Sequence, residues 1–450
     1  MHAGMLGAAV APVTADFSQD TWWLWVIKAV VIIVFLLTSV LFAIWFERKV
    51  VARMQVRPGP NVHGPFGLLQ SLADAMKLLF KEDMTVSAAD KIVYLVAPMI
   101  AVFCSLLTFA VIPLGPAVNL FGHHTPLQLT DFPVAVLYIL ACASVGVYGI
   151  VLGGWASNST YPLLGGVRST AQVISYELAM GLSLVTVFLM AGSMSTSQIV
   201  SSQTKLWWFI PLLPAFVIYV ISMVGETNRL PFDLPEAEGE LVGGYTTEYS
   251  SMKFAWFFLA EYINMLNVSA VATTLFLGGW RAPFGISLIN DGMFNTGWWP
   301  VLWFLVKLWA VMFFFVWVRG SVLRFRYDQF MNLGWKLLIP AALVWLVAVA
   351  AFKGLRDFSD LDLRTWLFVL AGVLVLAIVV SLFFPEKKAP EPTKAAAPRE
   401  FDPFAAGYPV PPLPGQVLPP SPRKGRVTAA ASVPAGAPDP SETTPEVHGG

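Results

Sequence analysis

Nine long apolar runs limit the folds that this chain can adopt. They cover residues 22–46, 91–113, 132–155, 170–192, 207–225, 254–280, 299–319, 334–352 and 364–384. Each run is long enough to cross roughly 30 Å of hydrocarbon as a helix. Only 12% of the residues are charged, against about 25% in soluble domains. The sequence therefore predicts an all-α integral membrane protein with about nine transmembrane helices.

Basic residues are distributed unevenly among the segments that join these runs. Those between the first and second runs are Arg48, Lys49, Arg53, Arg57, Lys77 and Lys81, whereas residues 114–131 contain neither Lys nor Arg. Because positive charge favours cytoplasmic loops, we expect residues 47–90 to be cytoplasmic. Alternation of the helices then places the segments near 156–169, 226–253 and 320–333 on the same side of the membrane.

An amphipathic helix is expected between the first two runs. Its apolar positions recur at helical spacing and are Leu68, Leu69, Leu72, Met76 and Leu79. Gln70, Asp74 and Lys77 occupy other positions in the same stretch. This pattern is typical of a helix that lies in the membrane interface, here over about residues 64–81.

The segment 226–253 contains far more acidic than basic residues. Its acids are Glu226, Asp233, Glu236, Glu238, Glu240 and Glu248, against Arg229 and Lys253. Pro231 and Pro235 prevent a continuous helix, and the apolar residues between them predict that part of the segment is buried. Crowded carboxylates raise one another's pKa and can hold protons near neutral pH, as a proton path or a redox-coupled switch requires. The alternative is an acidic loop that simply faces water.

Three ionisable residues lie inside the predicted spans, namely Glu177, Glu261 and Lys307. A charge within the bilayer costs about 3 kcal/mol or more. Such residues therefore face the protein interior, and they often mark an ion or substrate path. A structural ion pair or a side chain that reaches the interface is the alternative. Together with the acids of segment 226–253, Glu177 and Glu261 predict a line of carboxylates that enters the membrane from the cytoplasmic side.

The cysteines and histidines exclude several kinds of redox site. Cys104 and Cys142 lie in separate apolar runs, so no thiolate cluster can hold zinc or an iron–sulfur centre. The five histidines all lie outside the runs, which argues against bis-histidine haem, and we expect no metal site. Acidic and basic residues are equal in number, at 28 each, which leaves no net basic charge for nucleic acid.

The two ends of the chain differ from its apolar middle. Residues 1–21 lack the basic start of a cleaved signal, and we expect this N-terminal segment to lie outside the cell. Residues 385–450 are rich in Pro, Ala and Gly, which predicts a disordered cytoplasmic tail. Residues 356–384 are expected to contain an additional transmembrane helix.

Three segments of the chain resemble one family of respiratory membrane proteins. Residues 226–262, ETNRLPFDLPEAEGELVGGYTTEYSSMKFAWFFLAEY, resemble the signature loop of one membrane subunit of proton-translocating NADH-quinone oxidoreductase (complex I), designated H in bacteria and 1 in mitochondria. ERKV, RPGPN, GLLQ and ADAMKL within 47–83, and RGSVLRFRYDQFMNLGWK at 319–336, match the same family. The resemblance covers roughly residues 20–355 and predicts a membrane domain over 22–355.

This resemblance implies roles for individual residues. In the family, matching acids form a funnel that links a quinone cavity to proton channels in neighbouring subunits. The implied acids here are Glu177, Glu226, Asp233, Glu236, Glu238, Glu240, Glu248 and Glu261. Lys307 joins them as a proton-coupling candidate because of its position within a span. Roles at the quinone site or in docking a soluble arm are implied for Arg48, Asp74, Phe232, Arg319, Arg324, Arg326 and Asp328, although the arginines could instead only set the topology.

The sequence thus predicts a quinone-site subunit of a proton-pumping NADH:quinone oxidoreductase in the bacterial plasma membrane, without independent activity. The resemblance implies ubiquinone or menaquinone as substrate, with FMN and iron–sulfur clusters only in partner subunits. It also implies a soluble arm and antiporter-like membrane subunits as partners. Three alternatives stay open: a related subunit of a hydrogenase or another non-NADH dehydrogenase, a self-contained ion transporter, and a passive anchor for the soluble arm.

Overall fold

The computed structural model describes residues 15–204, 206–233, 241–283 and 293–358. Within these ranges, seven helical stretches are long and apolar enough to cross a membrane. They are α1 (Trp22–Met54), α3 (Lys91–Thr108), α4 (Ala135–Ala156), α5 (Thr160–Ala191), α9 (Ser251–Leu275), α10 (Trp299–Ser321), and α11 (Tyr327–Asn332) continued by a π-helical turn (Leu333–Leu338) into α12 (Ile339–Phe358). The predicted all-α membrane fold is thereby confirmed. The helix expected at 364–384, the tail at 385–450 and residues 1–14 lie outside the described residues.

The run at 207–225 forms a shorter apolar helix, α7 (Leu213–Glu226). Pro214 lies in its first turn, where the missing N–H would have no helical partner in any case. The residues before Leu213 form turns instead of extending the helix. Proline therefore sets the start of this helix, and the apolar run before it contributes only a turn segment.

The predicted loop at 156–169 is wrong, because α5 begins at Thr160 and only residues 157–159 separate it from α4. Packing at glycine explains the longer helix. A Cβ atom at Gly165 would lie only 2.7 Å from the backbone carbon of Gly244. The absent side chain therefore lets the first turns of α5 pack directly on the acidic segment, and this contact favours the helix over a loop.

One element was not expected from the apolar runs. β1 (Gly115–Leu120) and β2 (His123–Leu127) form an antiparallel hairpin after α3. Its turn residues Phe121 and Gly122 have φ values of 50° and 87°, as a tight hairpin turn requires. The hairpin is fastened to α1 through Lys28, whose ammonium contacts Asp20 and the Thr125 hydroxyl, each at 2.5 Å.

The amphipathic helix is confirmed as α2 (Gln70–Phe80). It begins at Gln70 rather than near residue 64 because a 3-10 turn precedes it, with Phe66 in the left-handed region at φ 56°. Leu72, Met76 and Leu79 remain exposed on the protein. An apolar face of this kind suits a helix that rests on the bilayer.

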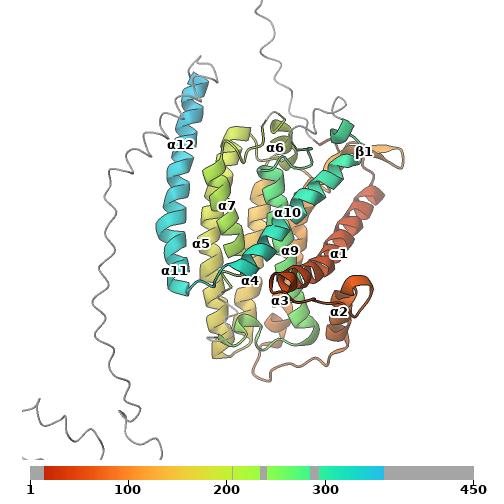
Figure 1. The fold of residues 1–450 in the computed structure, drawn as a ribbon, viewed down its shortest axis with the longest axis vertical. Coiled ribbons are helices and arrows are strands. Elements are labelled where there is room, and N and C mark those ends of the chain that lie inside the picture. Colours follow the sequence, from red (N-terminus) through yellow and green to blue (C-terminus); the bar gives the residue numbers. More distant parts are fainter. Residues whose placement is uncertain (1–14, 205, 234–240, 284–292, 359–450) are drawn as a thin grey trace, which may run out of the picture. The chain divides into compact units, whose positions relative to one another are not determined.

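The helices pack so that the connecting segments gather alternately at two ends (Figure 1). The hairpin and α6 (Thr196–Ser202) lie at one end, and α2 and α11 lie at the other. Hydrogen bonds agree with this arrangement: Ser251 Oγ donates to the Lys81 carbonyl at 2.9 Å, and Phe209 N–H donates to the Phe276 carbonyl at 3.1 Å. The predicted grouping of 47–90 with 226–253 at one end is confirmed, while the orientation across the membrane stays a prediction.

Helix α9 occupies the core of this unit, since it packs against α1, α2, α3, α6, α7 and α10. Most of its second half is buried, from Met265 to Leu275. The last three residues of the acidic segment (226–253) form its first turn. The position of that segment is therefore fixed relative to the most buried helix of the described residues.

We predict that Gly165→Ala destabilises the fold. Its Cβ would clash with backbone at Gly244, and overpacking of this kind costs about 1–3 kcal/mol. Gly181→Ala on the same helix is the matched control, because nothing lies within 4 Å of its Cβ position. Thermal unfolding of the detergent-solubilised protein measures both variants. Equal midpoints for the two would contradict the packing argument.

Candidate functional site

The first part of the acidic segment is held against α5 and the residues that follow α10. Gln172 Nε2 donates to the Phe232 carbonyl at 2.9 Å. The Phe232 side chain is only 5% exposed, and its ring centroid lies 4.5 Å from that of Phe330. Phe325 N–H donates to the Pro231 carbonyl at 3.1 Å. The predicted burial within this proline-rich stretch is confirmed for Pro231 and Phe232, and Phe232 therefore anchors the segment.

A largely buried ionic cluster lies beside this anchor, with only the Arg319 side chain exposed, at 38%. Its members are Glu47, Arg229, Glu261, Tyr262 and Arg319. Arg229 Nε lies 2.8 Å from Glu261 Oε1, and Arg229 Nη1 lies 3.8 Å from Glu47 Oε1. Glu47 also pairs with Arg319 and accepts a hydrogen bond from the Tyr262 hydroxyl at 2.8 Å. Arg229 thus faces both carboxylates with its side chain only 10% exposed, and a charge that is so largely removed from water needs such partners.

Two cavities adjoin the ionic cluster. One, of about 230 Å³, is lined by all five members and also by Arg48 and Asp233. A more open cavity of about 390 Å³ shares Glu47, Arg48 and Arg319 with it. Arg48 Nη1 also pairs with Asp74 Oδ2 of α2 at 2.5 Å. The structure therefore places Arg48 and Arg319 in the lining of the same two cavities. Asp74 does not line either cavity but contacts Arg48, which does.

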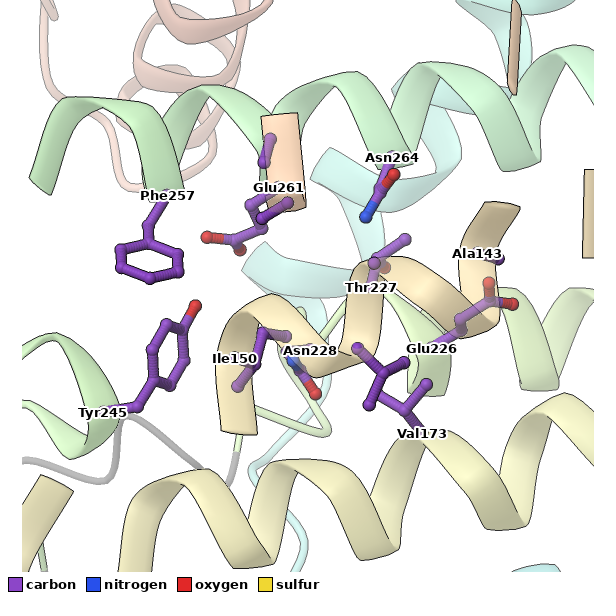
Figure 2. A pocket seen from close by; sticks show the side chains of 14 residues that line it. Ala143, Ile150, Val173, Glu226, Thr227, Asn228, Tyr245, Phe257, Glu261 and Asn264 are labelled. Atoms are coloured by element: carbon purple, nitrogen blue, oxygen red, sulfur yellow. The ribbon is translucent and has the colours of Figure 1, made fainter. Parts of the chain in front are cut away.

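A third cavity, of about 50 Å³, continues into the helix bundle (Figure 2). Glu261 and Asn264 enter it from α9, and Glu226 enters it from the end of α7. The Tyr245 hydroxyl points toward the same space. A fourth cavity of about 20 Å³ shares Glu226 and Asn264 with the third and is also lined by Asn267. In the order of the cavities of about 390, 230, 50 and 20 Å³, each cavity shares at least one carboxylate with the next.

Glu226 and Glu177 are partly buried acids on α7 and α5. Oε2 of Glu226 is buried and has no hydrogen-bond partner among the described residues. Glu177 on α5 accepts a hydrogen bond from the Ser144 hydroxyl of α4. Glu226 thus retains an oxygen that can accept a further hydrogen bond, and Glu177 shares one oxygen with Ser144.

Lys307 has different neighbours from the predicted acids. Its ammonium donates to the carbonyl oxygens of Leu277, Gly279 and Arg281 at 2.7, 2.9 and 2.6 Å. It also lies 4.1 Å from the ring centroid of Trp207. These carbonyls follow the C-terminal end of α9, whereas the acidic segment precedes its N-terminal end. The structure does not bring Lys307 together with Glu261, and its contacts resemble those of a helix cap.

The end of the acidic segment is held by backbone contacts. The Tyr94 hydroxyl donates to the Glu248 carbonyl at 2.6 Å, while the Glu248 side chain is half-buried. Tyr249 stacks on Tyr94 with ring centroids 4.1 Å apart. Burial raises the pKa of Tyr249 well above its ordinary value, so its hydroxyl stays a donor at neutral pH. Glu236, Glu238 and Glu240 lie outside the described residues.

The arginines that follow α10 lie in different environments. Arg324 Nη2 donates to the Asp233 carbonyl, so this side chain braces the acidic segment. Arg326 is mostly exposed and lies 3.6 Å from Asp328, which is equally exposed. The first arginine therefore contacts the candidate site directly, and the second is available at the protein surface.

Glu47 and Tyr262 are functional candidates that the sequence analysis did not select. Glu47 follows the first apolar run directly and falls within ERKV, which is the signal that could have found it. Tyr262 is adjacent to Glu261 but shows its role only through the hydrogen bond to Glu47. Among the described residues, no group of three His, Cys, Asp or Glu side chains could hold a metal ion.

Comparison with known proteins agrees with the expected family. The family model described as NADH dehydrogenase matches residues 27–350. The H subunit of the NADH-quinone oxidoreductase of Streptomyces avermitilis is 58% identical over 417 residues, which span 91% of each chain. The predicted resemblance over roughly 20–355 is thereby confirmed. The chain belongs to the NADH dehydrogenase family and is a membrane subunit of complex I.

Proposed function

We propose that this subunit forms one wall of the quinone chamber of a proton-translocating NADH:quinone oxidoreductase and passes the free energy of quinone reduction to neighbouring subunits through buried carboxylates. The observation that carries the proposal is the series of cavities with shared acids. Glu47 lines the cavities of about 390 and 230 Å³, Glu261 those of about 230 and 50 Å³, and Glu226 those of about 50 and 20 Å³. A proton or a change of charge can move along such a series in short steps.

The open cavity suits the head of a quinone. Val51 and Ala52 supply apolar surface, while Arg48, Arg57 and Arg319 supply positive charge. Reduction of a quinone to a quinol takes up two electrons and two protons, and partner subunits with FMN and iron–sulfur clusters would supply the electrons. Positive charge beside the ring stabilises the negative charge that develops before protonation. The chain's own contribution is electrostatic and does not include electron transfer.

Arg229 is suited to convert that charge change into a proton movement. It is shared between Glu47 and Glu261, at 3.8 and 2.8 Å. Added negative charge in the cavity would draw the guanidinium toward it and weaken its pair with Glu261. A carboxylate that loses its cation partner takes up a proton more readily. Glu261 would then exchange that proton with Glu226 across the third cavity.

The other predicted residues are assigned supporting roles in this proposal. Asp233, Glu248 and Glu177 flank the series, and Glu236, Glu238 and Glu240 would extend it toward the soluble arm. Phe232 and Arg324 would hold the segment in place, and Arg326 would dock the arm, which carries the terminal iron–sulfur cluster. Antiporter-like membrane subunits would receive the free energy. We propose a bacterial plasma membrane with the N-terminus outside and residues 47–90 inside.

The passive anchor is the alternative that the ionic cluster argues against most directly. An anchor has no need of buried charges beside open cavities, and such charges cost stability unless they are well paired. The second alternative, a self-contained ion transporter, requires an ion path that crosses the membrane within this subunit. Among the described residues, the series of cavities reaches Asn267 and its neighbours, and we infer that transfer proceeds to other subunits from there.

We predict that Glu226→Gln lowers quinone-dependent NADH oxidation and proton uptake by about 100-fold or more, as loss of a proton-transferring group does. Membranes carrying the variant complex are assayed with both readouts, and a native gel verifies assembly. Glu82→Gln is the matched control, because Glu82 is exposed and lies outside the series of cavities. Wild-type turnover and pumping in Glu226→Gln would favour the passive anchor instead.

We predict that Arg324→Ala and Arg326→Ala have different effects. Loss of the Arg324 contact to the Asp233 carbonyl loosens the acidic segment, so turnover should fall several-fold in complexes that retain the soluble arm. Arg326 is exposed, and exposed ion pairs weaken with salt. Arg326→Ala should therefore release the arm at lower salt, measured by native gels across a salt series, with normal turnover in the intact fraction. The same behaviour in both variants would contradict these separate roles.

A further inference from the structure

We propose that α2 is a tether that couples the cavity beside Arg48 to the end of the acidic segment, with Ser251 and Lys253 as positioning residues. The inference rests on the proposed function, because it assigns a mechanical connection to the same cavity and the same acids. Its evidence comes from contacts at two points of α2, at Asp74 in its middle and at its C-terminal end. Each point is bound by polar groups from a different part of the chain.

The C-terminal end of α2 is capped by the acidic segment. Ser251 Oγ donates to the carbonyl oxygens of Leu78 and Lys81, at 3.1 and 2.9 Å. Carbonyls in the last turn of a helix have no partner within the helix and must find one elsewhere. Ser251 has a φ of 56°, an uncommon backbone conformation for a residue other than glycine, which persists where the surroundings impose it. The serine is thus held in a strained position that completes α2.

An ion pair reinforces the same junction. Lys253 Nζ lies 2.9 Å from Asp83 Oδ2, and the lysine side chain is only 14% exposed. The ammonium also lies 5.0 Å from the ring centroid of Tyr94, whose hydroxyl binds the Glu248 carbonyl. Residues 248–253 are therefore fixed to the chain just after α2 and to α3 by a connected set of contacts.

The other junction of α2 faces the open cavity. Asp74 pairs with Arg48 at 2.5 Å, and Gln70 Nε2 donates to the second carboxylate oxygen of Asp74 at 3.1 Å. Arg48 lines both cavities next to the ionic cluster. Asp74 and Lys81 are seven positions apart, which is about 10 Å along a helix. One rigid helix of that length thus separates the cavity wall from the capped end.

A displacement of Arg48 would therefore reach the acidic segment through α2. A quinone head that attracts or repels Arg48 changes its pair with Asp74, and α2 moves as one body because its apolar face rests on lipid rather than on protein. Ser251 and Lys253 then shift the first turn of α9, which also carries Glu261. Linkage makes this coupling reciprocal. If quinone binding changes the free energy of the contacts at the junction, a variant that weakens these contacts must change the free energy of quinone binding.

The test uses Ser251→Ala, Lys253→Met and Asp83→Asn in the assembled complex within native membranes. Lys77→Met is the matched control, because this exposed lysine of α2 belongs to neither junction. Each sample is assayed for NADH oxidation with a hydrophilic acceptor, for quinone-dependent turnover, for the quinone KM, and for proton uptake per NADH. We expect a two- to five-fold change in KM or in proton uptake for the three junction variants only.

A charge swap and hydrogen exchange separate coupling from simple structural support. Asp83→Lys combined with Lys253→Asp should recover at least half of the loss, since it restores the ion pair. Addition of a short-chain quinone should change amide exchange at residues 244–251 at least two-fold in the wild type and in Lys77→Met. That response should be absent in Ser251→Ala and in Lys253→Met.

The outcomes distinguish the tether from the proposed function. If Glu226→Gln abolishes pumping while the junction variants keep a wild-type KM, proton uptake and exchange response, the tether is wrong and the proposed function stands. If Glu226→Gln pumps normally, the proposed function is wrong whatever the junction variants do. An exchange response that persists in every junction variant also overturns the tether.

Discussion

Arg229 and its two carboxylates determine how the acidic segment meets the rest of the protein. Glu47 comes from the end of α1, Glu261 from α9 and Arg319 from α10, so the ionic cluster joins three helices to one loop. Removing one partner from a buried pair costs about 3–5 kcal/mol because the other charge stays behind. The helices therefore have little freedom to shift independently. A change in the charge of the ionic cluster must instead be balanced by binding or release of a proton, or by a joint movement of the three helices.

The acidic segment is held at both of its described ends by contacts of different kinds. Its start is fixed by aromatic packing of Phe232 and by the Gln172 side chain, which respond weakly to charge. Its end is fixed by the Tyr94 hydroxyl, the Ser251 cap and the Lys253–Asp83 pair. Contacts made by hydrogen bonds and charges respond to a change of charge nearby. The start thus serves as a firm support, and the end is the part that is able to adjust.

The apolar runs predicted most of the helices because the bilayer requires continuous apolar length and internal hydrogen bonding. They did not predict the early start of α5, which depends on the contact of Gly165 with Gly244 from a distant segment. Glu261 was found because an acid stands out within an apolar run. Glu47 was missed because a charge at the end of a span has an ordinary explanation. Its role depends on residues far along the chain, Arg229 and Arg319, which no local pattern encodes.

Water explains how acids without direct contact could exchange protons. The cavities that contain Glu226 measure about 50 and 20 Å³, and about 10–15 Å³ is enough for one water molecule. Oε2 of Glu226 and Oδ1 of Asn267 are buried acceptors without hydrogen-bond partners among the described residues. Buried polar atoms of this kind are commonly satisfied by ordered water. A few water molecules would thus remove the burial cost of these acceptors and, by the same hydrogen bonds, connect Glu226 to Glu261.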